Sequence, residues 1–227
     1  MPWLIVTLIV LLLVFGPGLW VQRVLSRYSR PADRYPGTGG ELARHLLDGL
    51  GLGHVKAEIT DSGDHYDPEA KSVRLTADKF SGRSLTAITV AAHEVGHAHQ
   101  DATGYAPLRW RTRLVRLAAP GQRLGAGLLM FAPLMAILTR APITGLLMFL
   151  GGFLVMGLTT VIHAVTLPME LDASFGRALP MLQDGGYLRP GDEPHARRLL
   201  KAAALTYVAA SLMSLLNVAR WWAILRR

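Results

Sequence analysis

Long apolar runs alternate with polar, charged stretches along the 227-residue chain. Residues 3–21 are apolar except for one threonine, and residues 124–139, 141–165 and 202–219 form three further apolar runs. A helix needs about 20 apolar residues to cross the hydrocarbon core of a bilayer. The first and third runs reach that length, the second is shorter, and the fourth carries a polar stripe typical of packing on protein. We therefore predict a mainly α-helical, polytopic membrane protein.

The polar region between the first and second runs predicts a small folded domain. Leucines share one face of a predicted helix over residues 41–50. Residues 55–59 and 72–76 alternate apolar and polar side chains as strands do, and a longer helix is expected over residues 84–100. These elements indicate a small α+β domain that carries a β-hairpin. Residues 73–76 are either an edge strand that pairs with a substrate or part of an ordinary structural hairpin.

Composition supports the membrane prediction and narrows the chemistry. The chain is 51% hydrophobic and 18% charged, which is more apolar and less charged than soluble domains at roughly 45–50% and 25%. It has no cysteine, which excludes disulfides and cysteine-ligated zinc. No nucleic-acid-binding motif accompanies the net charge of +8, so we interpret this charge as a signal of membrane topology.

Arginine-rich segments follow the first apolar run and precede the second. Because basic loops stay on the cytoplasmic side, the N-terminus is expected outside the cell. The predicted divisions are a transmembrane anchor (1–21), a cytoplasmic zinc peptidase region (22–123), a transmembrane hairpin (124–165), a second cytoplasmic segment (166–200) and a C-terminal transmembrane or interfacial helix (201–227). We leave the last division open between these two alternatives. A spanning helix there would place the C-terminal arginines outside the cell, whereas basic segments normally stay on the cytoplasmic side.

Residues 93–97 form the pattern HExxH inside the predicted helix 84–100. His93 and His97, four residues apart, lie on one helical face and can bind one metal ion. Zinc lowers the pKa of a water that it binds to about 7, and Glu94 is placed to take the proton as the water attacks a carbonyl. His99 points to a different face, and we interpret it as a helix-surface residue or as a residue that supports a ligand without binding the metal. The pattern therefore predicts zinc-dependent peptide hydrolysis with Glu94 as the catalytic residue.

Two histidines leave a catalytic zinc site one protein ligand short. The longer pattern HExxHxxGxxH fails, because Gln100 and Thr103 stand where it needs glycine and histidine. We predict Glu170 as the third ligand, since Pro168 can open a helix with Glu170 in its first turn, on the same membrane side as the histidines. Asp172 is the alternative, either as a ligand or as a group that orients a ligand histidine.

Four segments together resemble a known family. They are Asp64-His65-Tyr66-Asp67-Pro68, the stretch around HExxH at 91–98, the stretch around Glu170 at 166–174, and residues 203–209. The chain resembles the YugP-like family of bacterial membrane neutral zinc metallopeptidases, and the resemblance implies a multi-pass, zinc-dependent peptidase with a minigluzincin-like domain. More distantly it is similar to the heat-shock and prenyl-protein membrane zinc proteases, which typically carry an aspartate where Ser174 stands here.

The expected function is that of a membrane-bound zinc endopeptidase of the bacterial inner membrane, with its active site on the cytoplasmic side. Its partners would be a membrane-associated protein or peptide substrate and the lipid bilayer, with no nucleic acid. His65, Tyr66 and Tyr207 are candidate donors to the oxyanion that peptide hydrolysis generates. The alternatives are an intramembrane zinc protease and a non-catalytic metal-binding scaffold or chaperone.

Overall fold

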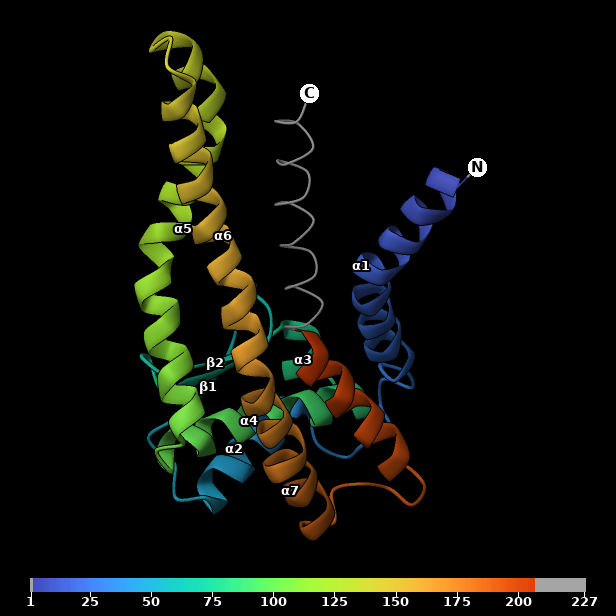
Figure 1. Ribbon diagram of the computed structural model, residues 1–227. Helices are drawn as coiled ribbons and strands as arrows, with labels where there is room; N and C mark the ends of the chain where they lie inside the picture. Colours follow the sequence, from blue (N-terminus) through green and yellow to red (C-terminus); the bar gives the residue numbers. More distant parts are fainter. Residues whose placement is uncertain (1, 207–227) are drawn as a thin grey trace. The chain divides into compact units, whose positions relative to one another are not determined.

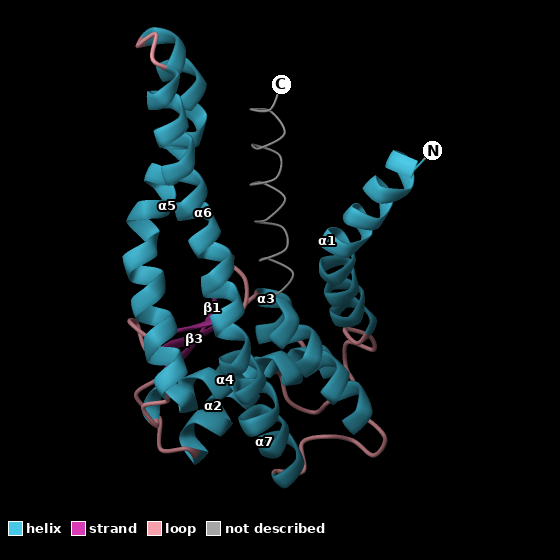
Figure 2. Ribbon diagram, in the orientation of Figure 1, coloured by secondary structure: helices cyan, strands magenta, loops and turns pink. Residues whose placement is uncertain are grey.

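The computed structural model describes residues 2–206, so most of the predicted fourth apolar run, and Tyr207 with it, lies outside the described residues. Helices dominate and the sheet is small (Figure 1, Figure 2). The elements are α1 (Pro2–Arg27), α2 (Gly39–Gly49), β1 (Lys56–Ile59), β2 (His65–Asp67), β3 (Ser72–Leu75), α3 (Ala77–Phe80), α4 (Leu85–Ala102), α5 (Ala106–Leu138), α6 (Pro142–Leu171), the π-helix η1 (Asp172–Ala178) and α7 (Leu179–Asp184). Residues 193–206 are also helical.

The chain forms two compact units. Residues 19–109 and 167–206 make the first, which contains the HExxH helix and which we call the peptidase unit. Among the described residues, 2–18 and 110–166 belong to the second, which we call the hairpin unit because α5 and α6 run antiparallel through it (Figure 1).

The core of the peptidase unit forms where α2, the sheet and α7 pack on α4. A capping box at Thr38 and Glu41 begins α2, because each side chain bonds the other residue's backbone amide. Val73, Leu75 and Val95 are completely buried in this core. Val73 and Leu75 are the apolar positions of the predicted alternating run 72–76, and both face this core.

Three strands form the sheet, in the order β1-β3-β2. β3 pairs with β1 in parallel and with β2 in antiparallel orientation. The predicted hairpin of residues 55–59 with 72–76 is wrong, because these two runs are parallel; β2 and β3 form the hairpin instead. The interpretation of residues 73–76 as an edge strand is wrong, because β3 has a neighbour on both sides. The sequence pattern missed β2, which has only three residues, and β2 takes one of the two edge positions.

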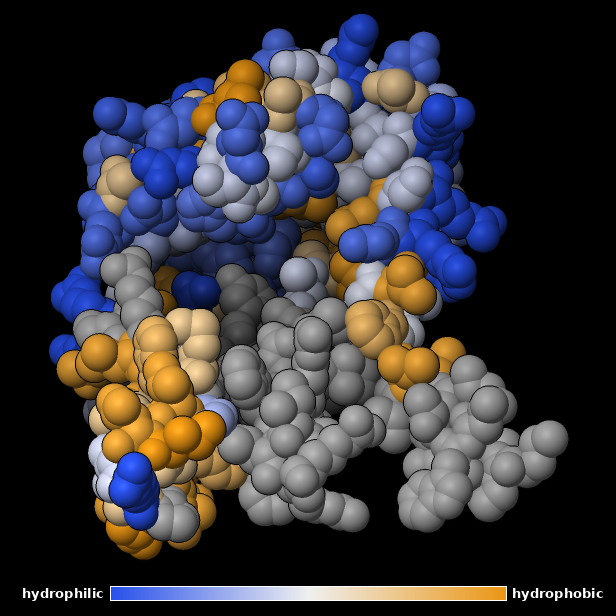
Figure 3. Space-filling model, turned by 90° about the horizontal axis from the view of Figure 1, so that it is seen from above, coloured by the Kyte–Doolittle hydropathy of each residue, from blue (hydrophilic) through white to orange (hydrophobic). Residues whose placement is uncertain are grey.

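The hairpin unit exposes large apolar side chains along α5 and α6, coloured orange in Figure 3. Gly145 permits close approach of the two helices, since a Cβ atom there would lie 2.6 Å from the Cβ of Ala136. Ala132 and Phe149 are buried where they pack together. The exposed apolar residues of α5 and α6 in this unit include Trp110, Val115, Leu117, Leu124, Met130, Phe131, Leu134, Ile137, Leu138, Ile143, Leu146, Leu147, Leu150 and Leu154.

The prediction of a polytopic membrane fold is wrong, because the structure lacks the spanning helices that it requires among the described residues. Within residues 2–206, no helix combines the length and the apolar character that crossing a membrane requires. The second apolar run shows a physical reason. It is only part of α5, whose first half carries Arg109, Arg111, Arg113 and Arg116. The mainly helical character and the small sheet of the prediction agree with the structure.

Candidate metal centre

Three side chains from two distant segments converge inside the peptidase unit. His93 and His97 lie in the middle of α4, which begins where the Ser84 side chain accepts a hydrogen bond from the backbone of Ala87. Glu170 lies in the last turn of α6, because Pro168 sits inside that helix and does not open a new one. The relative exposures of the two histidines are only 4% and 8%, and that of Glu170 is 0%. The structure thus brings Glu170 beside the two histidines, but it places Glu170 at the end of a helix and not in the first turn of one, as predicted.

The distances between these side chains suit a zinc ion. Oε2 of Glu170 lies 3.3 Å from Nε2 of His93 and 3.2 Å from Nε2 of His97, and one ligand atom from each residue lies within 4.8 Å of the others. Ligands placed tetrahedrally at zinc distances of about 2.0–2.1 Å lie about 3.3 Å apart. The other oxygen of Glu170 is buried without a hydrogen-bond partner in the described part of the chain. An orphaned carboxylate oxygen beside two imidazoles fits a cation, since a buried charge otherwise needs a partner.

The pKa shifts of Glu170 and His97 also indicate that the cluster suits a metal cation. Burial alone would raise the pKa of Glu170, but the two imidazoles outweigh burial and lower it to about 2. Burial lowers the pKa of His97, yet the Glu170 carboxylate reverses this and raises it to about 9. The carboxylate is therefore held ionised by positive neighbours, the role that a bound divalent cation fills.

His93 is held in one tautomer by Ser174 of η1. The Ser174 hydroxyl donates to the carbonyl of Leu200 at 3.0 Å, so its oxygen is left to accept from Nδ1 of His93, also at 3.0 Å. A proton on Nδ1 leaves the lone pair of Nε2 facing Glu170. Ser174 stands where the distantly similar proteases typically carry aspartate, and here a neutral hydroxyl makes the orienting contact.

Gln100 holds the second histidine and joins the two segments. Its amide nitrogen donates to the carbonyl of Met169 at 2.8 Å and to Asp172 at 2.7 Å, so its oxygen accepts from Nδ1 of His97 at 3.0 Å. Asp172, the rival ligand, also accepts from Arg177 at 2.9 Å and lies outside the metal cluster. Sequence reasoning missed Gln100, although its position three residues after His97 places it beside that histidine on α4.

A close approach of backbones brings η1 onto α4. A Cβ atom at Gly96 would lie 2.7 Å from the carbonyl oxygen of Ala173, so the glycine inside HExxH is needed for packing. π-helical turns are rare and occur frequently at functional sites. Here the π-helix begins two residues after Glu170 and contains Ser174, so one irregular segment adjoins a candidate ligand and holds the group that orients another.

Glu94 is nearly buried, with 6% exposure. Burial raises its pKa, while the nearby imidazoles of His93 and His97 oppose that rise. His99 stays outside the cluster of three, in agreement with the prediction. Burial lowers the pKa of His99, and the positive charge of Arg177 lowers it further.

Two of the predicted oxyanion donors lie on β2, and both already have partners. The hydroxyl of Tyr66 donates to Asp101 of α4 at 2.6 Å. Nδ1 of His65 donates to the carbonyl of Gly63 at 2.8 Å, so a neutral His65 presents a lone pair and no proton at Nε2. Tyr66 therefore fixes the β2 edge to the HExxH helix.

Comparison with known proteins gives the family. The family model described as "Putative neutral zinc metallopeptidase" matches residues 3–226. The chain is 35% identical over 224 residues to "Putative membrane protease YugP" of Bacillus subtilis (strain 168), with 97% of this chain and 95% of that protein covered. No solved structure matches. The YugP-like resemblance is thus confirmed, and the chain belongs to the neutral zinc metallopeptidase family.

Proposed function

We propose that this protein is a membrane-associated zinc endopeptidase. The observation that carries the proposal is the arrival of Glu170, from 73 residues further along the chain, at both imidazoles of the HExxH helix. His93, His97 and Glu170 are the proposed zinc ligands, and Glu94 is the proposed catalytic base. A closed structural zinc site would take four protein ligands and would leave Glu94 without a role.

The mechanism divides the work among the side chains of this chain. Bound zinc would supply a Lewis acid that acidifies water and polarises a peptide carbonyl. Ser174 and Gln100 accept the Nδ1 protons of His93 and His97, so that with zinc bound the Nε2 lone pairs of both imidazoles would face the metal. Glu94 takes a proton from the attacking water on its carboxylate and passes it to the leaving amide nitrogen. The low exposure of these groups limits bulk water and strengthens each charge interaction.

The substrate would bind in extended form along the free edge of β2. Strand addition supplies main-chain hydrogen bonds without regard to sequence. Tyr66 ties this edge to Asp101 on α4 at 2.6 Å, and Lys71 donates to the same carboxylate. An extended peptide paired with β2 would therefore be held in register with the HExxH helix.

Membrane association rests on two observations. The Bacillus subtilis relative is named as a membrane protease, and the hairpin unit exposes many large apolar side chains (Figure 3). Exposed apolar patches of this extent mark sites of protein or membrane contact. We accordingly propose membrane-bound or membrane-proximal proteins as substrates, cleaved on the cytoplasmic side.

The test is Glu94→Gln in the full-length, zinc-loaded protein. We expect zinc content to be unchanged and cleavage of a fluorescein-labelled unfolded protein to fall by about 10²–10⁴-fold, the usual contribution of a general base. Glu193→Gln is the matched control, because Glu193 pairs with Arg197 at the surface and should keep full activity. Wild-type protein that binds zinc and cleaves nothing would favour the scaffold instead, and an active Glu94→Gln variant would remove Glu94 from the mechanism.

A further inference from the structure

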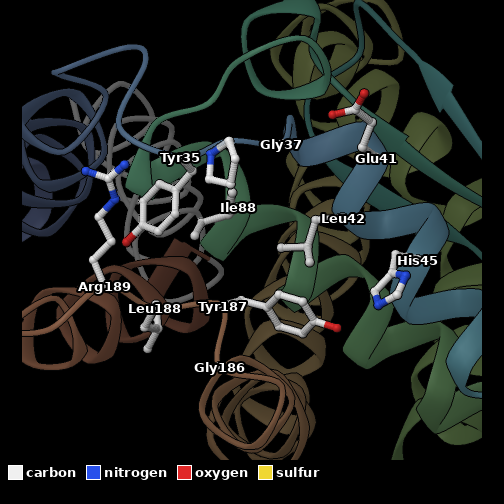
Figure 4. Close-up of a pocket in the computed structure, with 11 residues that line it drawn as sticks. Tyr35, Gly37, Glu41, Leu42, His45, Ile88, Gly186, Tyr187, Leu188 and Arg189 are labelled. Carbon is white, nitrogen blue, oxygen red and sulfur yellow. The ribbon is translucent and has the colours of Figure 1, made fainter.

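The peptidase unit contains cavities away from the metal cluster, and two of them adjoin the segment 186–192. One has a volume of about 430 Å³ and a largely apolar lining that includes Leu42 and Ile88 (Figure 4). The ring of Tyr35 lines this cavity, while its hydroxyl donates at 2.5 Å to Asp192, which lines the second cavity. The two cavities therefore lie on either side of one hydrogen bond but differ in chemistry.

The second cavity, about 350 Å³ in volume, is basic. Its lining contains three guanidinium groups and one carboxylate, together with a tyrosine and a histidine: Arg27, Arg30, Arg34, Asp192, Tyr28 and His195. Small-molecule sites range over about 300–1,000 Å³, so this volume can hold more than a single small ion. None of these residues belongs to the metal cluster.

The single carboxylate of this cavity, that of Asp192, already accepts hydrogen bonds from protein side chains. Asp192 is 2% exposed and accepts from Nε and Nη2 of Arg34 at 2.7 and 2.6 Å, in addition to its bond from Tyr35. This bidentate pair fixes the guanidinium of Arg34 in place. These two bonds use Nε and Nη2 of Arg34, and Nη1 takes part in neither of them.

The other two arginines have no acidic partner. The side chains of Arg27 and Arg30 are exposed, and no carboxylate of the described residues lies within 4.0 Å of either one. Beside them, Tyr28 and His195 stack with ring centroids 5.0 Å apart, and the Tyr28 hydroxyl lies 3.1 Å from Nδ1 of His195. The cavity thus carries an excess of two positive charges and further polar groups at its wall.

We propose that this cavity binds a phosphate group, carried either by a lipid headgroup or by free phosphate. A guanidinium group can donate two parallel hydrogen bonds to a phosphate. A carboxylate ligand would need only one such group, and this cavity has three arginines. Arg34 is the pre-oriented donor, and Arg27 and Arg30 close on the remaining oxygens. In the lipid case, the site would fix the peptidase unit at an anionic membrane surface.

The test uses the full-length protein and the double variant Arg27→Gln/Arg30→Gln, with Arg30→Gln as a second variant. Inorganic phosphate is titrated by calorimetry, and co-sedimentation is measured with phosphatidylcholine vesicles with and without phosphatidic acid. Arg109→Gln is the matched control, since it removes the same charge from an exposed position outside the cavity. Each lost guanidinium should weaken binding about tenfold, with unchanged melting temperature and zinc content.

Each outcome decides the proposal. Phosphate binding that the Arg27 and Arg30 variants lose and Arg109→Gln keeps supports the site and identifies free phosphate as a ligand. The same pattern with phosphatidic acid vesicles alone supports the site and identifies the headgroup. Equal weakening by Arg30→Gln and Arg109→Gln, which each remove one charge, would show a diffuse effect of the net charge of +8 and would overturn the proposal, as would no binding in either arm.

Discussion

The packing of η1 on α4 makes Gly96→Ala the most direct probe of the site. The added methyl would lie 2.7 Å from the carbonyl oxygen of Ala173 and 3.4 Å from its Cα and carbonyl carbon. Ordinary contacts begin at 3.4 Å, so the two segments must separate by about 0.7 Å. The obstructing atom belongs to the backbone, and no side-chain rotation can relieve the overlap.

The expected magnitudes differ for stability and for activity. Overpacking of this kind costs about 1–3 kcal/mol, while alanine gains up to about 1 kcal/mol over glycine within a helix. The net loss of about 0–2 kcal/mol corresponds to a melting temperature lower by at most roughly 8 °C for a chain of this size. Misplacement of reacting groups by about 1 Å can cost 10²-fold in rate. We therefore expect activity to fall more steeply than stability.

The assay compares Gly96→Ala with Gly49→Ala. Gly49 lies in α2 with nothing within 4 Å of an added Cβ atom, so its substitution should be neutral or slightly stabilising. Melting temperature, zinc affinity by chelator competition and cleavage of an unfolded protein are measured for both variants. A Gly96→Ala protein with wild-type zinc affinity and wild-type cleavage would refute the argument that this glycine sets the distance between ligand segments.

Three further predictions follow from the same structure. Gln100→Leu should lower zinc affinity by about 10–100-fold, measured by chelator competition, because His97, Met169 and Asp172 lose their shared partner. Removal of zinc with a chelator should lower the free energy of unfolding, by about 4 kcal/mol relative to protein held at a zinc concentration 1,000 times its Kd, measured by urea denaturation. Burial raises the pKa of Asp192, but its bonds from Arg34 and Tyr35 outweigh burial and leave the pKa below 3.8. The stability from this carboxylate is therefore present above about pH 4 and lost as pH falls through the lowered pKa, so Asp192→Asn should flatten the fall of unfolding free energy between pH 5 and pH 2, and an unchanged slope would contradict this assignment.

The residues that determine the candidate chemistry could be predicted from the sequence, because their spacing is local. His93 and His97 share a helical face by their separation alone. Glu170 was predicted from a helix start at Pro168 and from a membrane topology, and neither premise holds, because Pro168 lies inside α6 and no described helix can cross a membrane. The requirement for a third ligand was the part of the argument that led to a residue beside the histidines. The long helix 84–100 and the buried face of residues 72–76 follow from periodicity in the same way.

The elements that were missed depend on tertiary contacts. β2 has three residues, and so short a run cannot show a clear alternation of apolar and polar side chains. It is a strand because it pairs with β3. The π-helix Asp172–Ala178 was not predicted, and it packs closely on α4, where a Cβ atom at Gly96 would lie 2.7 Å from the carbonyl oxygen of Ala173. The polytopic prediction rested on the lengths of the apolar runs, but no helix within residues 2–206 has the length and apolar character to cross a membrane. The second run also continues into the arginines that the prediction assigned to a separate cytoplasmic region, because both belong to α5.

α4 and the segment from the end of α6 into η1 hold each other's candidate ligands in place. Ser174 reaches from η1 to orient His93 on α4, while Gln100 reaches from α4 to bind the backbone next to Glu170. Each segment therefore fixes a ligand, or the backbone beside a ligand, of the other. Any disturbance of one segment must misplace ligands from both, so zinc affinity and the packing of α4 against η1 should change together in every variant at this junction.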